Sequence, residues 1–468
     1  MKIQYFEGND FGKTGDCDEK VSSSSSEMSI DRLSALPDDI LIHILSFLGL
    51  KESVVSSVLS KRWKFLWTEL PELIFVDLNQ EIEKIHEFVA VVNKALLTRS
   101  RIHLRKFDVC FRYYGGSVSS DVDSWVDFAV KNKVEEVCLY LNSMAEDELY
   151  ELPETMYSNS SLTRFSVRGC LMDTLTKIEW QSLTRLEIED TEVLQHVIEN
   201  ILSGCPVLHT MDLDECWGFS CLDIKSQNLK ELKVHDREED ENGPLLEISA
   251  PYVQTLDISF NAEGRKLVLR NTKSLVRAKF DFNGYEQPNS EEARSLAKEV
   301  YEIILLHVIE LELGRFYFIV LSELVVNGWQ LPVSKRKCLT VFTQSEDKHN
   351  ISGIFALLKY SPNLEQLAIE GFEPEGLGWD EAAAGDLDCE LLHLKSVSIN
   401  EFADPAFNGE PMQTVVRTLL KRATVLEEIN VRLRPFRIGV RELIDFVTIS
   451  RKLLTYPRSS GKAVVRLD

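Results

Sequence analysis

An apolar spacing that returns along most of the chain constrains its fold more than any other feature. From Leu104 onward, apolar residues recur at the first, fourth and sixth places of a short motif, and the early motifs begin 21 to 30 residues apart. The clear occurrences begin at Leu104, Val134, Leu162, Leu183, Leu208, Leu229, Val253, Leu275, Val308, Leu364, Leu394 and Leu426. A repeat of this length predicts an array of similar units stacked side by side.

The positions inside each motif predict the structure of one unit. Alternate side chains of a strand point to opposite faces, so the fourth and sixth residues would be buried and those between them exposed. A leucine-rich repeat prefers asparagine or cysteine soon after the strand, where a small polar side chain satisfies the turning backbone. Such residues stand there at Asn142, Cys170, Cys216, Asn261 and Asn283. The pattern predicts an α/β fold, a leucine-rich-repeat solenoid (horseshoe) with a parallel sheet on its concave face.

The segments between the motifs are expected to contain helices. Apolar periodicity and capping residues predict helices at about 81–98, at 193–202 and at 290–307. Between positions 313 and 364 the motif is less regular. Two sets of residues could together fill this gap: Leu321 with Leu324 and Val326, and the run 339–342.

Residues 31–70 form an apolar stretch of a different kind, ahead of the repeats. Pro37 suits the first position of a helix, and apolar residues then recur at three- and four-residue spacing up to Gly49. Two more short helices follow, the last with Trp63 and Trp67 among basic residues. About forty residues cannot bury this much apolar surface on themselves, so part of it should face the following domain or another protein.

Three segments of this stretch resemble the F-box of plant F-box proteins. They read LPDDIL at 36–41, HILSFL at 43–48 and LSKRWKFLW at 59–67. F-boxes are three-helix modules that bind the Skp-family adaptor of cullin-RING (SCF-type) ubiquitin ligases, so the resemblance implies an adaptor-binding surface here. Matched residue by residue, the adaptor contacts would be Leu36, Pro37, Ile40, Leu41, Ile44, Leu45, Val55, Ser60, Trp63 and Trp67. We interpret the remaining apolar residues Leu48, Val58 and Leu59 as core, because an apolar helix stripe is more often core than interface.

Further resemblances lie in and after the repeats. SGCPVL at 203–208 and SPNLE at 361–365 look like segments of plant F-box leucine-rich-repeat proteins, and residues 389–433 resemble the FBD segment that often ends them. On this basis we expect five regions. They are a disordered tail at 1–30, an F-box domain at 31–78, a leucine-rich-repeat domain at 79–388, FBD-like terminal repeats at 389–433 and a C-terminal extension at 434–468.

Charge and composition argue against several classes of function. The formal charge of −23 at pH 7 would repel a phosphate backbone, so we expect no nucleic acid partner. The basic run at 335–337 is interpreted as a solvated loop rather than an import signal. No membrane span or secretory leader is indicated, and nine scattered cysteines predict neither disulfides nor a zinc site. We expect a protein of the nucleus, the cytoplasm or both, without a membrane partner.

The sequence carries no motif for catalysis. It has no phosphate-binding glycine loop, no G-x-S-x-G elbow and no kinase signature. Cys205, His209 and Cys216 come nearest to a metal cluster, but Cys205 precedes a proline and Cys216 fits the asparagine/cysteine position of a repeat. We therefore expect no enzyme activity, no cofactor and no metal.

A binding face is expected on the exposed side of the strands, which displays charge of both signs. Arg164, Arg168 and Arg185 are predicted to lie together there and to hold an acidic peptide or a phosphate group of a target through forked hydrogen bonds. The alternative for each of them is an ordinary solvated position.

The resemblance implies a substrate-recognition subunit of an SCF-type E3 ubiquitin ligase. The F-box would bind the Skp-family adaptor, and through it the cullin-RING ligase, while the repeats would bind a target protein for ubiquitination. Two alternatives stay open: a leucine-rich-repeat scaffold or inhibitor that recruits no ligase, and a small-molecule receptor, since plant F-box repeat proteins include hormone sensors. Co-purification with the adaptor separates the first alternative from the ligase subunit.

Overall fold

The structure is a computed structural model that divides into two compact units, within Met1–Leu208 and within His209–Asp468. The described residues are 33, 35–77, 84–99, 104–143, 149–172, 176–236, 245–261, 266–283, 291–302, 306–343, 350–371, 389–403, 410–435 and 440–467. The tail expected at 1–30 lies outside them. Each unit is described by itself.

The first unit opens with a small helical head. Its helices are α1 (Asp38–Leu45), α2 (Leu50–Val55), and the 3-10 helices η1 (Ser56–Val58) and η2 (Trp63–Glu69). Pro37 is the N-cap of α1, one position before the helix, where its missing N–H breaks no helical hydrogen bond. The head has a core of its own, made of Leu41, Leu45, Trp63, Leu66 and Leu70.

A parallel sheet follows the head in the first unit. Its strands are β1 (Glu72–Asp77), β2 (Lys106–Tyr113), β3 (Glu136–Ser143), β5 (Arg164–Arg168) and β7 (Arg185–Glu189). The register aligns the fourth position of each motif in one buried row: Phe107, Val137, Phe165 and Leu186. The sixth positions form the next buried row: Val109, Leu139, Val167 and Ile188. The predicted alternation is confirmed.

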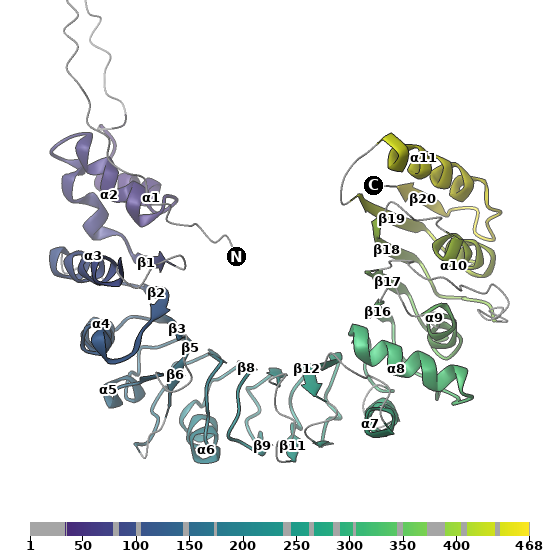
Figure 1. Ribbon diagram of the computed structural model, residues 1–468, viewed down its shortest axis with the longest axis horizontal. Coiled ribbons are helices and arrows are strands. Elements are labelled where there is room, and N and C mark those ends of the chain that lie inside the picture. The colour runs from purple at the N-terminus through teal and green to yellow at the C-terminus, as the bar shows by residue number, and fades with distance from the viewer. Residues whose placement is uncertain are drawn as a thin grey trace, which may run out of the picture. The chain divides into compact units, whose positions relative to one another are not determined.

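Helices cover one face of this sheet (Figure 1). They are α3 (Ile85–Thr98), α4 (Ser119–Lys131), the short α5 (Glu154–Tyr157) and α6 (Gln195–Gly204). A 3-10 helix, η4 (Gly115–Ser117), precedes α4, and two short strands, β4 (Tyr150–Glu151) and β6 (Cys170–Leu171), pair with each other. The buried indole N–H of Trp125 on α4 donates to Asn93 on α3 at 2.6 Å. This bond fixes the two helices to each other as they pack on the sheet.

The second unit is a longer sheet of the same kind. Its strands are β8 (Thr210–Asp214), β10 (Glu231–His235), β12 (Thr255–Asn261), β14 (Arg277–Asn283), β15 (Glu310–Leu313), β16 (Cys338–Phe342), β17 (Gln366–Glu370), β18 (Ser396–Ala403), β19 (Glu428–Pro435) and β20 (Val464–Leu467). Every neighbouring pair is parallel. Met211 aligns with Leu232, and Leu213 with Val234, so the motif register is kept here too.

The opposite side of these repeats changes along the second unit. Three short strands, β9 (Cys221–Asp223), β11 (Leu246–Ser249) and β13 (Leu267–Arg270), form a second parallel sheet behind the early repeats. Helices take that place later: α7 (Glu291–Val300), α8 (Arg315–Val326), α9 (Asn350–Lys359), α10 (Glu410–Arg422) and α11 (Val440–Thr455) (Figure 1). The predicted α/β solenoid with a parallel sheet is confirmed.

The asparagine/cysteine position behaves as the sequence predicts. The buried thiol of Cys170 lies 3.5 Å from the carbonyl oxygen of Arg168, and the thiol of Cys216 lies 3.4 Å from that of Asp214. Both cysteines therefore donate to the backbone two residues earlier, where the chain leaves the strand. The side chains of Asn261 and Asn283 lie outside the described residues.

The structure corrects one interpretation of the irregular segment and confirms the other. Leu321, Leu324 and Val326 lie on helix α8 and not on a strand. The sequence pattern was ambiguous, because a three-residue spacing fits one face of a helix as well as it fits the repeat motif. The run 339–342 is the strand, within β16.

The basic run at 335–337 is not simply a solvated loop. Arg336 is fully buried, its guanidinium donates to the hydroxyls of Ser334 at 2.8 Å and Tyr301 at 2.7 Å, and it lies over the Tyr301 ring. A basic residue can thus be part of a core when hydroxyls and an aromatic ring solvate it.

The end of the chain contributes more than the sequence indicated. The region 434–468, predicted only as a C-terminal extension, supplies both α11 and β20, which pairs with β19. Within the described parts of the chain, no helix combines the length and the apolarity needed to cross a bilayer.

Candidate protein-binding surface

The head has an apolar surface in addition to its apolar core. Val58 is 81 % exposed, Phe47 75 % and Leu59 65 %. Further large apolar side chains are exposed on the same four helices and the turn after α1: Ile40, Leu48, Val54, Val55 and Phe65. Isolated exposed leucines are common on proteins. Eight large apolar side chains exposed within a short head, in contrast, indicate a binding surface.

The predicted contact residues divide into three groups by burial. Pro37, Ile40 and Val55 are exposed. Leu36, Ile44, Ser60 and Trp67 are half-buried. Leu41, Leu45 and Trp63 are buried in the core of the head.

This division corrects part of the predicted set. Leu41, Leu45 and Trp63 cannot contact a partner while the head is folded, because their side chains already fill its interior. Conversely, Leu48, Val58 and Leu59, interpreted as core, are exposed. The apolar residues at positions 54, 55, 58 and 59 span about 140° of an ideal helix, which is a single broad face. This spacing does not distinguish core from binding surface, so the sequence carried no signal for the exposure of Val58 and Leu59.

Polar contacts hold the segments that carry this surface. The buried hydroxyl of Ser53 on α2 donates to the carbonyl of Leu45 at 3.1 Å and so ties α2 to the end of α1. Arg62 joins the start of η2 to α1 through an ion pair with Asp38 and a hydrogen bond to the carbonyl of Leu36, both at 2.5 Å. The apolar side chains are therefore presented on a fixed scaffold.

The three arginines proposed as an anion site do not converge. Arg164 and Arg185 are neighbours across β5 and β7, but Arg168 stands four residues further along β5, about 13 Å away along the strand. Arg168 pairs with Glu189 at 3.0 Å, and Arg185 pairs with Glu187 at 2.6 Å. Two of the three guanidiniums are thus neutralised within the chain. Arg164 makes no ion pair with any residue that the structure describes.

The exposed strand face of the second unit carries a row of alternating charges. Asp212, Lys233, Asp257, Lys279 and Glu312 follow one another in register from β8 to β15. The Lys233 ammonium lies 3.2 Å from Asp212, and the Lys279 ammonium lies 3.4 Å from Asp257. Opposite charges at neighbouring positions satisfy one another, so this part of the face is charged but internally paired.

The same row becomes uncharged over the later strands. Thr340, Ala368, Ser398 and Asn430 continue it from β16 to β19. All four are half-buried by the neighbouring strands. Neutral polar side chains cost less to desolvate than charged ones, so a protein can cover this uncharged stretch more easily than the charged row before it.

The buried cysteines Cys170 and Cys205 are not activated as nucleophiles or ligands. Burial raises the pKa of the Cys205 thiol to about 12 and raises that of Cys170 as well, so both stay protonated. Within the described ranges, no three His, Cys, Asp or Glu side chains are grouped so that they could hold a metal ion.

Comparison with known proteins agrees with this architecture. A family model for the F-box domain matches residues 33–75, and a model for the LRR domain of At1g61320/AtMIF1 matches residues 96–430. The first covers the head with its exposed apolar side chains, and the second covers most of the repeats.

Curated relatives from Arabidopsis thaliana have the same two parts in their names. The chain is similar to F-box/LRR-repeat protein At3g03360, with 26 % identity over 93 % of this chain and 90 % of the relative. It is 29 % identical to F-box/LRR-repeat protein At5g02910 over 73 % and 72 % of the two chains. It is also 29 % identical to F-box protein At5g03100 over 65 % of this chain and 95 % of the relative. Because the repeat model spans well over half of the chain and the F-box model spans its head, the chain belongs to the F-box/leucine-rich-repeat family.

Proposed function

We propose that this protein is a substrate-recognition subunit of an SCF-type (cullin-RING) E3 ubiquitin ligase. Its head binds the Skp-family adaptor, its repeats bind a target protein, and it carries no catalytic residue of its own. Its contribution to ubiquitin transfer is to hold the target near the conjugating enzyme, which raises the effective concentration of the target there. Such an assembly places it in the nucleus, the cytoplasm or both.

The observation that carries the proposal is the exposed apolar surface of the head. The head already has a core, made of Leu41, Leu45 and Trp63 with their neighbours. The exposure of Val58, Leu59 and Phe47 therefore does not result from a missing core. A surface of this kind is stabilised when a partner removes it from water, at about 25 cal/mol for each Å² buried. The adaptor contacts proposed here are Leu36, Pro37, Ile40, Ile44, Val55, Ser60 and Trp67, joined by Phe47, Leu48, Val58 and Leu59.

The target-binding role is proposed for the exposed strand faces of the repeats. The uncharged stretch from Thr340 to Asn430 offers a surface of low desolvation cost, and Arg164 offers one guanidinium without an internal carboxylate among the described residues. The paired charges between Asp212 and Glu312 would contribute orientation more than affinity, because a partner must compete with ion pairs that already exist.

A scaffold or inhibitor that recruits no ligase is the second proposal. It keeps the role of the repeats and gives the apolar head surface a different partner. Co-purification distinguishes the two, since only a ligase subunit brings the Skp-family adaptor and a cullin with it.

The test compares the full-length wild type with a double variant in the head and with a single control variant on α3. Val58→Asp with Leu59→Asp places charge on the exposed surface of the head, whereas Leu97→Asp places it on α3, where Leu97 is also exposed. Each is purified from plant cells treated with a proteasome inhibitor, and bound proteins are identified by mass spectrometry. We expect adaptor and cullin with the wild type and with Leu97→Asp only, and target proteins with all three. Absence of adaptor from the wild type would overturn the ligase assignment.

A further inference from the structure

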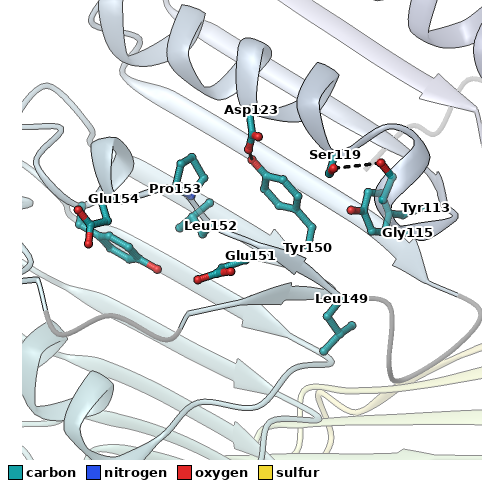
Figure 2. Close-up of a pocket in the computed structure, with 12 residues that line it drawn as sticks. Tyr113, Gly115, Ser119, Asp123, Leu149, Tyr150, Glu151, Leu152, Pro153 and Glu154 are labelled. Carbon is teal, nitrogen blue, oxygen red and sulfur yellow. Dashed lines mark hydrogen bonds between the residues drawn. The ribbon is translucent and has the colours of Figure 1, made fainter.

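An open pocket of about 580 Å³ lies in the first unit, away from the head surface. It is formed where β2 ends, η4 turns into α4, and β4 leads into α5 (Figure 2). Its volume lies within the range of small-ligand sites, roughly 300–1,000 Å³.

The charged groups of the pocket have one sign. Asp123, Glu151 and Glu154 line it, and no lysine, arginine or histidine is among its lining residues. None of the three carboxylates forms an ion pair with any described residue. Asp123 accepts a hydrogen bond from the Tyr150 hydroxyl at 2.7 Å, and Glu154 accepts one from the Thr176 hydroxyl at 3.1 Å. Figure 2 shows Asp123 reaching from α4 toward Tyr150, with Glu151 and Glu154 on the segment that follows.

Two buried tyrosine rings support the pocket, and apolar residues complete its described lining. The rings of Tyr113 and Tyr150 meet edge to face, with centroids 6.1 Å apart. Burial, together with the hydrogen bond to Asp123, raises the pKa of Tyr150, so its hydroxyl stays protonated. Leu149 and Pro153 are half-buried and offer apolar surface beside the carboxylates, which attract an organic cation.

We propose that this pocket binds an aliphatic organic cation, a guanidinium or primary ammonium group carried on a flexible chain. The carboxylates of Asp123 and Glu151 pair with the charged end, and the half-buried side chains of Leu149 and Pro153 contact the apolar stem. This site is separate from the proposed ligase role, because none of its residues belongs to the head.

A bare metal ion does not fit this geometry. The carboxylates of the pocket are not among any group of three close enough to hold a metal, as far as the described residues extend. A metal needs several oxygens within about 2.6 Å of one point. Separated carboxylates along a long wall suit a larger cation whose charge and stem occupy different parts of the pocket.

The same chemistry could come from a free amine or from an arginine or lysine side chain of a protein. Four probes distinguish these sources: 1,5-diaminopentane, Nα-acetyl-arginine amide, a nine-residue glycine/serine peptide with one central arginine, and the same peptide with citrulline. Citrulline keeps the shape of arginine and removes its charge. Binding to the full chain is measured by isothermal titration calorimetry at low and at physiological salt.

Three variants test the location. Gly116 lines the pocket, and the Cβ of an added side chain there would meet no atom within 4 Å, so Gly116→Trp adds a large side chain at the pocket wall without overlapping the backbone. Asp123→Asn with Glu151→Gln removes two charges and keeps their size. Glu87→Gln on α3 is the control, since Glu87 is an exposed acid outside the pocket.

We expect saturable binding of at least one cationic probe, none of the citrulline peptide, and weakening by about fivefold or more in the double variant. Tighter binding of the arginine peptide than of the small cations would identify a protein side chain as the source of the cation. Tighter binding of the small cations would identify a free amine. Absence of saturable binding, or equal binding by wild type and Gly116→Trp, would overturn the proposal. Adaptor binding by these variants should stay unchanged, so failure here is distinct from failure of the ligase assignment.

Discussion

At the scale of single residues, Asp281 shows how the exposed strand face and the helical layer are joined. Its carboxylate accepts hydrogen bonds from the backbone N–H groups of Phe316 at 3.1 Å and Tyr317 at 3.3 Å, in the first turn of α8. Burial raises the pKa of Asp281, and these donors oppose that shift. A carboxylate at this end of a helix satisfies free N–H groups and the helix dipole.

We expect Asp281→Ala to lower the free energy of unfolding of the second unit by about 1–2 kcal/mol, because α8 loses its cap. Denaturant unfolding followed by circular dichroism measures the change, with Thr340→Ala on the same face as the control. A Cβ at Gly314 would lie 2.0 Å from Cγ of Asp281, so Gly314→Ala should displace the same carboxylate. The losses of stability caused by Asp281→Ala and Gly314→Ala should not add up in the double variant, because both remove the same interaction. Full additivity would show that Asp281 does not act as this cap.

His235 should make the stability of the second unit depend on pH. Its Nδ1 lies 3.1 Å from Asp214 and its Nε2 lies 3.2 Å from Asp257. These carboxylates raise the pKa of His235 from 6.5 to about 9, against the opposing effect of burial. A raised pKa means that the folded state holds the proton more tightly than the unfolded state. The stabilisation is complete below pH 6.5 and is lost as the pH rises to about 9.

The expected loss across that pH window is about 3 kcal/mol. Thermal melting of wild type and His235→Gln from pH 6 to 9.5 measures it, with His86→Gln on α3 as the control. The difference in Tm between wild type and His235→Gln should shrink as the pH rises. Parallel profiles would contradict the assignment of a charged His235.

At the scale of elements, the contact between α8 and α9 depends on a glycine. A Cβ at Gly353 on α9 would lie 2.0 Å from the Ser322 hydroxyl oxygen and 3.1 Å from the ring of Phe318, both on α8. Gly353→Val should therefore destabilise the second unit by about 1–3 kcal/mol through overpacking. Gly461→Ala is the control, because nothing lies within 4 Å of its added Cβ. Equal melting temperatures for the two variants would contradict the close packing.

The head separates residues that maintain its fold from residues that face outward. Leu45→Ala should lower the free energy of unfolding of the head by about 2–5 kcal/mol, since Leu45 is fully buried. Val58→Ala should change stability by less than about 0.5 kcal/mol, since Val58 is exposed. Amide hydrogen exchange across residues 38–70 measures both. Equal loss of protection in the two variants would mean that Val58 belongs to the core.

The strands were predictable from the sequence because the repeat fixes two buried positions in each of them. The row from Met211 through Leu232 needs only the period of two in a strand and the constant register of the motif. The segment around α8 was not predictable, because spacing by three fits a helix face and the repeat motif equally. Which side of a head helix is core was also beyond the pattern, as Leu41 and Val58 are both apolar and only the packing distinguishes them.

The target face was harder to predict than the fold. Sequence position placed Arg164, Arg168 and Arg185 on the exposed face correctly, since each lies on the expected side of its strand. It could not show that Glu187 and Glu189 from the next strand neutralise two of them, because pairing between strands depends on register. The pocket around Asp123 and Tyr150 has no sequence pattern at all, since it joins a helix to a short strand 27 residues later.

At the scale of the whole molecule, the proposed function gives one chain two roles: the head would bind a common adaptor, and the repeats would select a target. The two parts need not share residues, because tethering requires only that both stay bound at once. Substitutions in the exposed head surface should therefore abolish recruitment and leave target binding intact. Substitutions in the uncharged stretch from Thr340 to Asn430 should have the opposite effect.

The most direct measurement is calorimetric titration of the full chain with a purified Skp-family adaptor at several temperatures. We expect a one-to-one complex whose heat-capacity change is negative, because apolar surface of the head is removed from water. Val58→Asp with Leu59→Asp should abolish that binding, and Leu97→Asp should keep it. The claim would be contradicted if the adaptor failed to bind the wild type, or bound the double variant with unchanged affinity.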